Sequence, residues 1–243
     1  MTAGRVREVR HALHAAGTVR DESGVERPLL PTAIERPLAD ALAELLGSIS
    51  PTHTLEVGLA FGISTLAFCE ALLDHGGPGG GHVAIDPYER SGFGNAGLLV
   101  LREAGVEGLV EFHEDDSHLV LPELERAGRR FDAAFVDGDH RFESVFVDMH
   151  YCARMLEPGG LLLVDDCWMP AIRLAVAYFV TNLGYELLEG VLGGQEYRRG
   201  RWRSRGQLAV LRPPDEPPPR AWHSFVPFAG RFQHLSTVVA CAW

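Results

Sequence analysis

The feature that most constrains this chain is an alternation of short apolar runs with longer segments of helical spacing. Five apolar runs resemble strands, at residues 52–58, 82–86, 109–115, 131–139 and 160–166. Helical patterns follow them at 63–76, 95–105, 117–128, 141–160 and 170–184. Near-continuous apolar strands are typical of a parallel sheet that helices cover on both faces. The alternation therefore predicts an α/β fold of the Rossmann type.

The pattern changes after Gly184, and two further strands are expected at 185–194 and 205–213, joined by a long polar turn. They would form a C-terminal antiparallel hairpin and complete a seven-stranded, mostly parallel sheet. Residues 1–32 are charged and punctuated by proline and glycine, which predicts a loosely organised arm. A helix is expected at 33–48. These boundaries suggest three parts: an arm and helix that could act as a lid (1–50), a main domain (51–212) and a proline-rich, apolar tail (213–243).

Composition narrows the class of partner. The chain of 243 residues carries 33 acidic and 22 basic side chains, for a formal charge of −11, which argues against nucleic acid as the main partner. The basic run from Arg198 to Arg205 is interpreted as a solvated hairpin. None of the four cysteines forms a CxxC pair. No apolar run reaches the ~18 residues of a membrane span, and the N-terminus lacks a signal core. We expect a cytoplasmic enzyme without a membrane partner.

A glycine-containing loop follows the first expected strand. Gly58 and Gly62, with Ala60 between them, allow a tight turn and a close approach of the backbone to a ligand. The next helix presents free N–H groups at its start. A dinucleotide fingerprint would require glycine or alanine where this chain has Ile63. Glu56 before the turn would repel a pyrophosphate and suits a ligand with an amino group, so the loop disfavours NAD.

Acidic residues stand at the ends of the strands that follow. Asp86 ends the second strand, Asp116 and Ser117 follow the third, and Asp137 with Asp139 follow the fourth. Each acid has an ordinary interpretation as a turn or helix-capping residue. Open α/β sheets bind their ligands at the carboxyl edge of the strands. Acids repeated at one edge therefore predict a binding site there.

The series EVGLAFGISTL, AIDPY, HEDDS, FVDGDH and LEPGGLLLVDD resembles the class I S-adenosylmethionine (SAM)-dependent methyltransferases, over about residues 52–212. The resemblance implies a residue for each part of SAM. The methionine end would contact Glu56, Gly58, Ala60, Gly62 and Ser64, the ribose Asp86, and the adenine Asp116 and Ser117, with Asp137 also beside the cofactor. Ala60 stands where the family usually has its middle glycine.

The fifth strand ends in two adjacent acids, Asp165 and Asp166. The fourth and fifth strands are neighbours in this type of fold, so Asp137 should lie close to both. Three carboxylates at one point would raise one another's pKa unless a cation lay among them. A hard divalent ion such as Mg²⁺ takes these oxygen ligands. An ordinary strand-end turn before Pro170 is the alternative.

The segments DGDHRFES and VDD are similar to the metal-dependent small-molecule O-methyltransferases, most closely the macrocin-type sugar enzymes, and catechol-type enzymes share the three-ligand arrangement. The resemblance implies that Asp137, Asp165 and Asp166 hold the metal and that Asp139 is the general base. His140 departs from the sugar enzymes, which commonly have an apolar residue there. Because the free pKa of histidine lies near working pH, His140 is an alternative base.

The sequence thus predicts a SAM-dependent, Mg²⁺-assisted O-methyltransferase that acts on a hydroxyl of a small natural product, sugar or phenol. A metal-independent enzyme with His140 as base, and a non-catalytic SAM-binding protein, remain alternatives. Tyr88, Phe93 and Trp168 would form a substrate wall or pack locally. The apolar C-terminal tail makes a homo-oligomer plausible.

Overall fold

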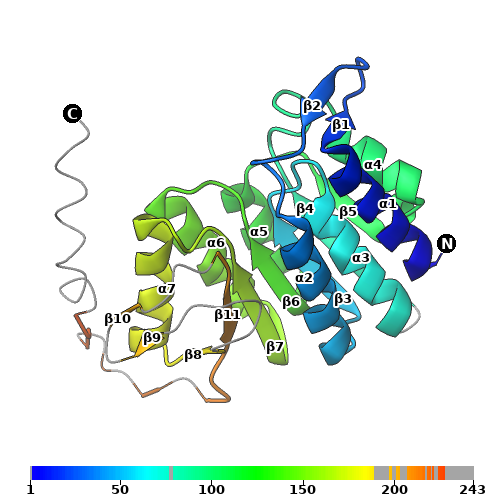
Figure 1. Ribbon diagram of the computed structural model, residues 1–243. Coiled ribbons are helices and arrows are strands. Elements are labelled where there is room, and N and C mark those ends of the chain that lie inside the picture. Colours follow the sequence, from blue (N-terminus) through cyan, green and yellow to red (C-terminus); the bar gives the residue numbers. More distant parts are fainter. Residues whose placement is uncertain are drawn as a thin grey trace, which may run out of the picture.

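The computed structural model describes residues 2–76, 79–188, 197–198, 201–202, 207–216, 218–219, 221 and 224–227. At its centre is a seven-stranded sheet in the order β5-β4-β3-β6-β7-β11-β8 (Figure 1). The bounds of its strands are β3 His53–Val57, β4 Gly81–Ile85, β5 Val110–His113, β6 Phe131–Val136, β7 Leu156–Val164, β8 Glu186–Leu187 and β11 Ala209–Arg212.

The first five strands of this sheet are parallel, and β11 runs antiparallel to both β7 and β8. The predicted Rossmann-like sheet with its C-terminal antiparallel hairpin is therefore confirmed. From β3 the chain adds β4 and β5 on one side, and then returns to add β6 and β7 on the other. The adjacent strands β3 and β6 therefore mark a topological switch point of the sheet. The loops that follow these two strands lead away in opposite directions, and a ligand crevice is expected between them at the carboxyl edge.

Helices cover both faces of the sheet. Helices α1 to α4 lie on one face and α5 to α7 on the other (Figure 1). Their bounds are α1 Ala3–Ala16, α2 Arg36–Ile49, α3 Ile63–His75, α4 Ala96–Ala104, α5 Ser117–Arg126, α6 Phe142–Arg154 and α7 Pro170–Asn182, with a short 3₁₀ turn at Glu107–Leu109.

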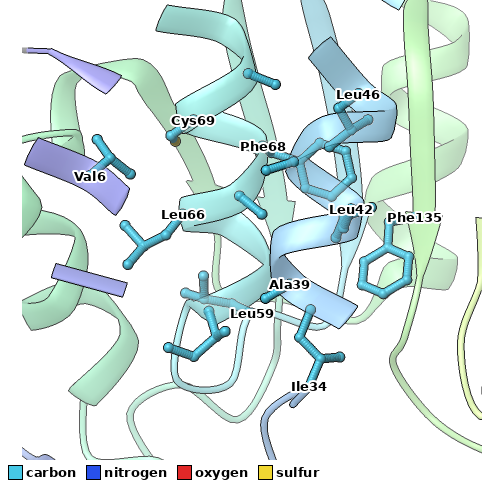
Figure 2. Close-up of a cluster of buried hydrophobic side chains, with 14 of the residues drawn as sticks. Val6, Ile34, Ala39, Leu42, Leu46, Leu59, Leu66, Phe68, Cys69 and Phe135 are labelled. Carbon is cyan, nitrogen blue, oxygen red and sulfur yellow. The ribbon is translucent and has the colours of Figure 1, made fainter. Parts of the chain in front are cut away.

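Each face of the sheet packs against its own apolar cluster. Strand β6 contributes side chains to both clusters, because successive side chains of a strand point to opposite faces of the sheet. Ala133 and Phe135 join the cluster under α1 to α4, while Ala134 and Val136 join the one under α5 to α7. Figure 2 shows the first of these clusters, in which Phe135 lies with Phe68 and Leu42. A strand buried on both faces is why its sequence is apolar without alternation.

The expectation of a loosely organised arm over residues 1–32 is wrong. The segment contains α1 and a two-stranded hairpin of β1 Thr18–Arg20 and β2 Glu26–Pro28. Arg10 of α1 is 1% exposed and bonds Glu70 of α3 at 2.8 Å and Asp40 of α2 at 2.7 Å. These charged contacts attach α1 to the main domain. The proposed domain boundaries and the lid stay predictions.

In the C-terminal half, one prediction about β7 is wrong, and others concern residues outside the described ranges. Strand β7 begins at Leu156, so the predicted glycine stop at Gly159 and Gly160 lies within the strand, beside a register shift against β6. Within the basic run, a backbone hairpin pairs β9 Tyr197–Arg198 with β10 Arg201–Trp202. The solvation of that run, and most of the apolar tail, lie outside the described residues.

Candidate active site

A cavity of about 840 Å³ opens at the carboxyl edge of the parallel strands. It is built from the loops that follow β3, β4, β5, β6 and β7, together with residues from the segment before α2 and the start of α6. The predicted site residues that line it are Gly58, Ala60, Ser64, Asp86, Asp116, Ser117, Asp137, Asp139, His140 and Asp166. Glu56, Gly62 and Asp165 were also predicted, but they lie behind this wall.

The glycine loop contains three residues with positive φ, Gly58, Ala60 and Gly62. Gly58 has φ of 100°, and a Cβ there would lie 2.1 Å from the carbonyl oxygen of Asp137. Only glycine permits this approach between the loops after β3 and β6. Ala60 has φ of 46°, an uncommon conformation for a residue with a side chain. The departure from the family's glycine is therefore accommodated with backbone strain at the cavity wall.

Asp86 holds this loop in place. One of its oxygens accepts hydrogen bonds from the backbone N–H groups of Leu59 and Ala60 at 3.0 and 2.9 Å. The other accepts from Tyr88 N–H at 2.8 Å. Asp86 thus joins the loops after β3 and β4 while lining the cavity. A carboxylate has further lone-pair sites, so the predicted contact with ribose hydroxyls stays a prediction.

Glu56 occupies an interior position rather than the cavity wall. Its side chain is 0% exposed, accepts a hydrogen bond from Ser64 at 2.9 Å and another from Thr65, and lies 3.2 Å from His82. These partners come from α3 and β4. The carboxylate therefore fixes the start of α3 against the sheet, and among the described residues it reaches the cavity only through Ser64.

The acids at the ends of β6 and β7 meet one another around His140. One ligand atom from each of Asp137, His140 and Asp166 lies within 4.8 Å of the others. His140 Nε2 lies 2.7 Å from Asp166 Oδ2 and 4.0 Å from Asp137 Oδ1. The carboxylates of Asp137 and Asp166 raise the pKa of His140 to about 10. The imidazolium is therefore the cation that balances these acids in the absence of a metal ion.

Asp166 is aimed at this cluster by an unusual backbone. Its φ is 52°, which is left-handed, and Trp168 Nε1 donates to its Oδ1 at 2.7 Å. Burial alone would raise the pKa of Asp166, but the hydrogen bonds from His140 and Trp168 hold it below its ordinary value. A strained backbone that directs one carboxylate is a common device at functional sites.

Asp165 lies just behind the cluster. It is 2% exposed, its Oδ1 has no hydrogen-bond partner among the described residues, and its Oδ2 lies 3.4 Å from Gln207 Nε2. Burial, and then the charge of Asp137, raise its pKa. A buried oxygen without a donor, next to two more carboxylates, fits a hard divalent ion. The three-aspartate ligand set stays a prediction, and His140 Nε2 lies beside two of its members, Asp137 and Asp166.

Asp139 has other partners. Its Oδ2 accepts from the Ser144 hydroxyl at 2.8 Å, and its Oδ1 lies 3.4 Å from the Arg141 N–H. It therefore stabilises the first turn of α6. Both candidate bases line the cavity, but His140 is the one that joins the acid cluster.

The cavity has an apolar side. Tyr88 and Phe93 line it, with Tyr88 61% exposed and the Phe93 ring packed edge-on to Phe61 at 5.4 Å. Trp168, the third residue of the predicted substrate wall, is not among the lining residues, and its indole N–H donates to Asp166. Its contribution to a wall stays a prediction.

Several residues that line the cavity were not predicted as site residues from the sequence. Residues 31–34, which precede α2, line the cavity. The β1–β2 hairpin that precedes them is held by Arg27, which donates to Gly92 O at 2.9 Å, and by Glu22 N–H, which donates to Gly94 O at 2.9 Å. Another is Asp148, an acid on the buried face of α6. The sequence did contain a signal for it, because Asp148 lies three residues after Val145 on a helix face that is otherwise apolar.

These features define a class. A glycine loop at the switch point of a Rossmann-like sheet, with acids at successive strand ends, is the arrangement of class I SAM-dependent methyltransferases. The family described as a methyltransferase domain matches residues 55–167. That segment runs from β3 to the loop after β7 and carries most of the cavity.

Known proteins support the same class. Caffeoyl-CoA O-methyltransferase of Stellaria longipes is 30% identical over 135 residues, which are 54% of this chain and 52% of that protein. Tricin synthase 2 of Oryza sativa subsp. japonica is 35% identical over 138 residues, 55% of this chain and 44% of that protein. The crystal structure of the O-methyltransferase TomG from Streptomyces achromogenes, in complex with SAM, has a TM-score of 0.60 at 22% identity, and covers 86% of this chain and 89% of that chain.

Residues 55–167 therefore match a family described as a methyltransferase domain, in agreement with the resemblance found in the sequence. The chain spans about half the length of the curated relatives it matches. The likeness to the solved structure, at its level of identity, shows the fold. Within the part of the chain that the structure describes, no helix is both long and apolar enough to cross a membrane.

Proposed function

We propose that this protein is a metal-assisted O-methyltransferase that moves the methyl group of SAM to a hydroxyl of a small molecule. The observation that carries the proposal is the cluster of Asp137, His140 and Asp166, which lies on the same cavity as the glycine loop. The cluster supports the proposal because it combines a histidine, which in its neutral form can accept a proton, with carboxylate oxygens of the kind that hard divalent ions bind.

The reaction requires one proton to be removed. The acceptor O–H gives its proton to His140 Nε2, an oxygen lone pair attacks the methyl carbon, and the carbon–sulfur bond breaks with its electron pair left on sulfur. The products are the methyl ether and S-adenosylhomocysteine. Positioning of the two reactants accounts for much of the rate enhancement in such a transfer, and general base catalysis contributes typically about 10²- to 10⁴-fold.

His140 can accept a proton only as neutral imidazole. Its ion pairs with Asp137 and Asp166 oppose this, because they raise the pKa of His140 to about 10. Asp137, Asp165 and Asp166 are the residues that would hold a divalent ion, which when bound would neutralise their charge and acidify the acceptor hydroxyl. The hydrogen bond from Trp168 would keep the Asp166 carboxylate directed toward the other two aspartates of this set.

The acceptor is proposed to be phenolic. Two of the curated relatives are named for caffeoyl-CoA and for tricin. Tyr88 and Phe93 supply aromatic surface beside the cavity that suits a flat ring. A sugar hydroxyl is the alternative acceptor. With a formal charge of −11, the protein is proposed to have no nucleic-acid partner, and self-association stays a proposal.

The test combines binding with turnover. SAM is titrated calorimetrically, and turnover is then measured on caffeoyl-CoA, simple catechols and glycosylated acceptors, with Mg²⁺ and with EDTA. Micromolar SAM binding and EDTA-sensitive methylation of a phenol are expected. EDTA-resistant methylation would favour a metal-independent enzyme with His140 as base. SAM binding without turnover of any acceptor would favour a non-catalytic SAM-binding protein, and absence of SAM binding would refute the proposal.

A further inference from the structure

Asp148 is an acid in an apolar setting. It lies on the inner face of α6 between Val145 and Met149, and is 1% exposed. Neither of its carboxylate oxygens has a hydrogen-bond partner among the described residues. Burial of a carboxylate without donors is costly, and here it raises the pKa of Asp148 to about 6. A fold seldom keeps such a group unless something supplies the donors.

The same side chain borders the active-site cavity. Asp148 lines it together with residues from the starts of α5 and α6, namely Asp116, Ser117, His118, Ser144 and Val147. The Ser117 hydroxyl lies near the Asp148 carboxylate and lowers its pKa, which partly offsets the rise caused by burial. The Ser117 and Ser144 hydroxyls and the His118 ring can each donate or accept a hydrogen bond, whereas the Asp148 carboxylate can only accept, so a ligand N–H or O–H group would give it the donor that it lacks.

The layout of the cavity indicates which part of SAM would reach it. His140 and Asp166, at the ends of β6 and β7, mark the end where the methyl group is transferred. Asp86, at the end of β4, lies beside the glycine loop and faces the middle of the ligand. The region between α5 and α6 is what remains for the nucleobase. The adenine ring of SAM has one hydrogen-bond donor group on its edge, the exocyclic amino group, and carboxylates are acceptors.

We propose that Asp148 is a specificity-determining residue that accepts a hydrogen bond from the exocyclic amino group of the SAM adenine. The inference rests on the proposed function. A site built to bond a particular N–H group rejects an analogue that lacks it, because a buried acceptor is then left unpaired. The protein should thus discriminate against a nucleobase that carries a carbonyl oxygen in place of the amino group.

A structural role for Asp148 is the competing explanation. Helix α5 begins at Ser117 without a side-chain cap, and Asp148 lies close enough to affect it. If the carboxylate served only to stabilise that helix, its removal would lower stability and weaken all ligands of the cavity alike. A ratio of two affinities separates the explanations, because a general loss of structure cancels from it.

The experiment compares S-adenosylhomocysteine with its deaminated analogue, S-inosylhomocysteine, by isothermal titration calorimetry. For the unmodified protein we expect the deaminated analogue to bind at least about tenfold more weakly, since hydrogen bonds to charged groups contribute about 1.5–3 kcal/mol. In Asp148→Asn the carboxamide can donate to the carbonyl oxygen, so the preference should shrink or reverse. Glu103→Gln, at an exposed position of α4 away from the cavity, is the matched control and should keep the original preference.

The outcomes are distinct. Equal affinities of the unmodified protein for the two ligands would overturn the inference, and this comparison needs no variant to fold. An unchanged ratio in folded Asp148→Asn, with both ligands weakened and Tm lowered, would assign Asp148 the structural role instead. If S-adenosylhomocysteine does not bind the unmodified protein, the proposed function itself fails. Binding without discrimination leaves that function standing and refutes only the role of Asp148.

Discussion

His140 Nε2 lies 2.7 Å from Asp166 Oδ2, so a side chain from the loop after β6 meets a carboxylate from the loop after β7. Asp166 adopts a left-handed backbone at this contact. Asp139, next to His140 in sequence, instead bonds Ser144 at the start of α6. Two neighbouring residues that were equal candidates for the general base therefore have different surroundings.

The first prediction concerns the general base. His140→Ala should lower kcat by about 10²- to 10⁴-fold, because a positioned base contributes that much, while the Kd for SAM stays close to that of the unmodified protein. Asp139→Asn should lose less turnover and should change the free energy of unfolding by less than about 0.5 kcal/mol, because the contact is exposed and the carboxamide oxygen can still accept from the Ser144 hydroxyl. Steady-state kinetics and urea unfolding of both variants decide the matter. A larger loss of turnover in Asp139→Asn would move the base to Asp139.

The second prediction concerns the metal. Mg²⁺ should bind the unmodified protein, and Asp165→Asn and Asp166→Asn should each weaken that binding by roughly tenfold or more, since even second-layer partners of metal ligands have effects of this size. Calorimetric titration of Mg²⁺ measures this without any substrate. Glu103→Gln serves as the control, because it also removes one negative charge but does so at an exposed position of α4. Unchanged Mg²⁺ affinity in both aspartate variants would refute the ligand set.

The third prediction concerns the N-terminal helix. Arg10→Ala should lower the free energy of unfolding by roughly 3–5 kcal/mol, because it leaves Glu70, itself 4% exposed, with only the half-exposed Arg7 as a described cationic partner. Arg5→Ala, which breaks an exposed ion pair with Glu8 at 3.8 Å, should change it by less than about 0.5 kcal/mol. Urea unfolding of the two variants provides the comparison. Equal effects would mean that the Arg10 ion pairs do not hold α1 in place.

The fourth prediction concerns pH. Glu89 is 0% exposed, and burial raises its pKa from 4.5 to about 7. The folded state therefore binds the proton more tightly than the unfolded state. The stability contributed by the protonated group is complete below pH 4.5 and is lost as pH rises through about 7.

Glu89→Gln removes this titration while keeping an acceptor for the N–H groups of Gly97 and Leu98, which Glu89 binds at 2.8 and 3.2 Å. Relative to the unmodified protein, the variant should gain about 1–3 kcal/mol of stability between pH 5 and pH 8, because one pKa unit corresponds to about 1.4 kcal/mol. Urea unfolding at the two pH values measures the gain. A difference between the two proteins that does not change with pH would contradict the raised pKa.

Much of the fold could be predicted because its signals are local. The apolar runs that became β3 to β7 and the helical patterns between them depend on side chains a few residues apart, and the order of a parallel sheet follows from short connections. The end of β7 in Asp165 and Asp166 was recognisable for the same reason. The α1 segment was misjudged because its stabilising partners, Glu70 and Asp40, are distant in sequence.

The amino-acid sequence by itself determined the class of fold, the position of the glycine loop and the edge at which the acids gather, since parallel strands bring their carboxyl ends together. Only the tertiary structure decided which acids face the cavity. Asp165 is turned into the interior while Asp166 meets His140, and Glu56 is held inside by Ser64, Thr65 and His82. The direction of a side chain depends on backbone angles and partners from other elements, and neither is local in sequence.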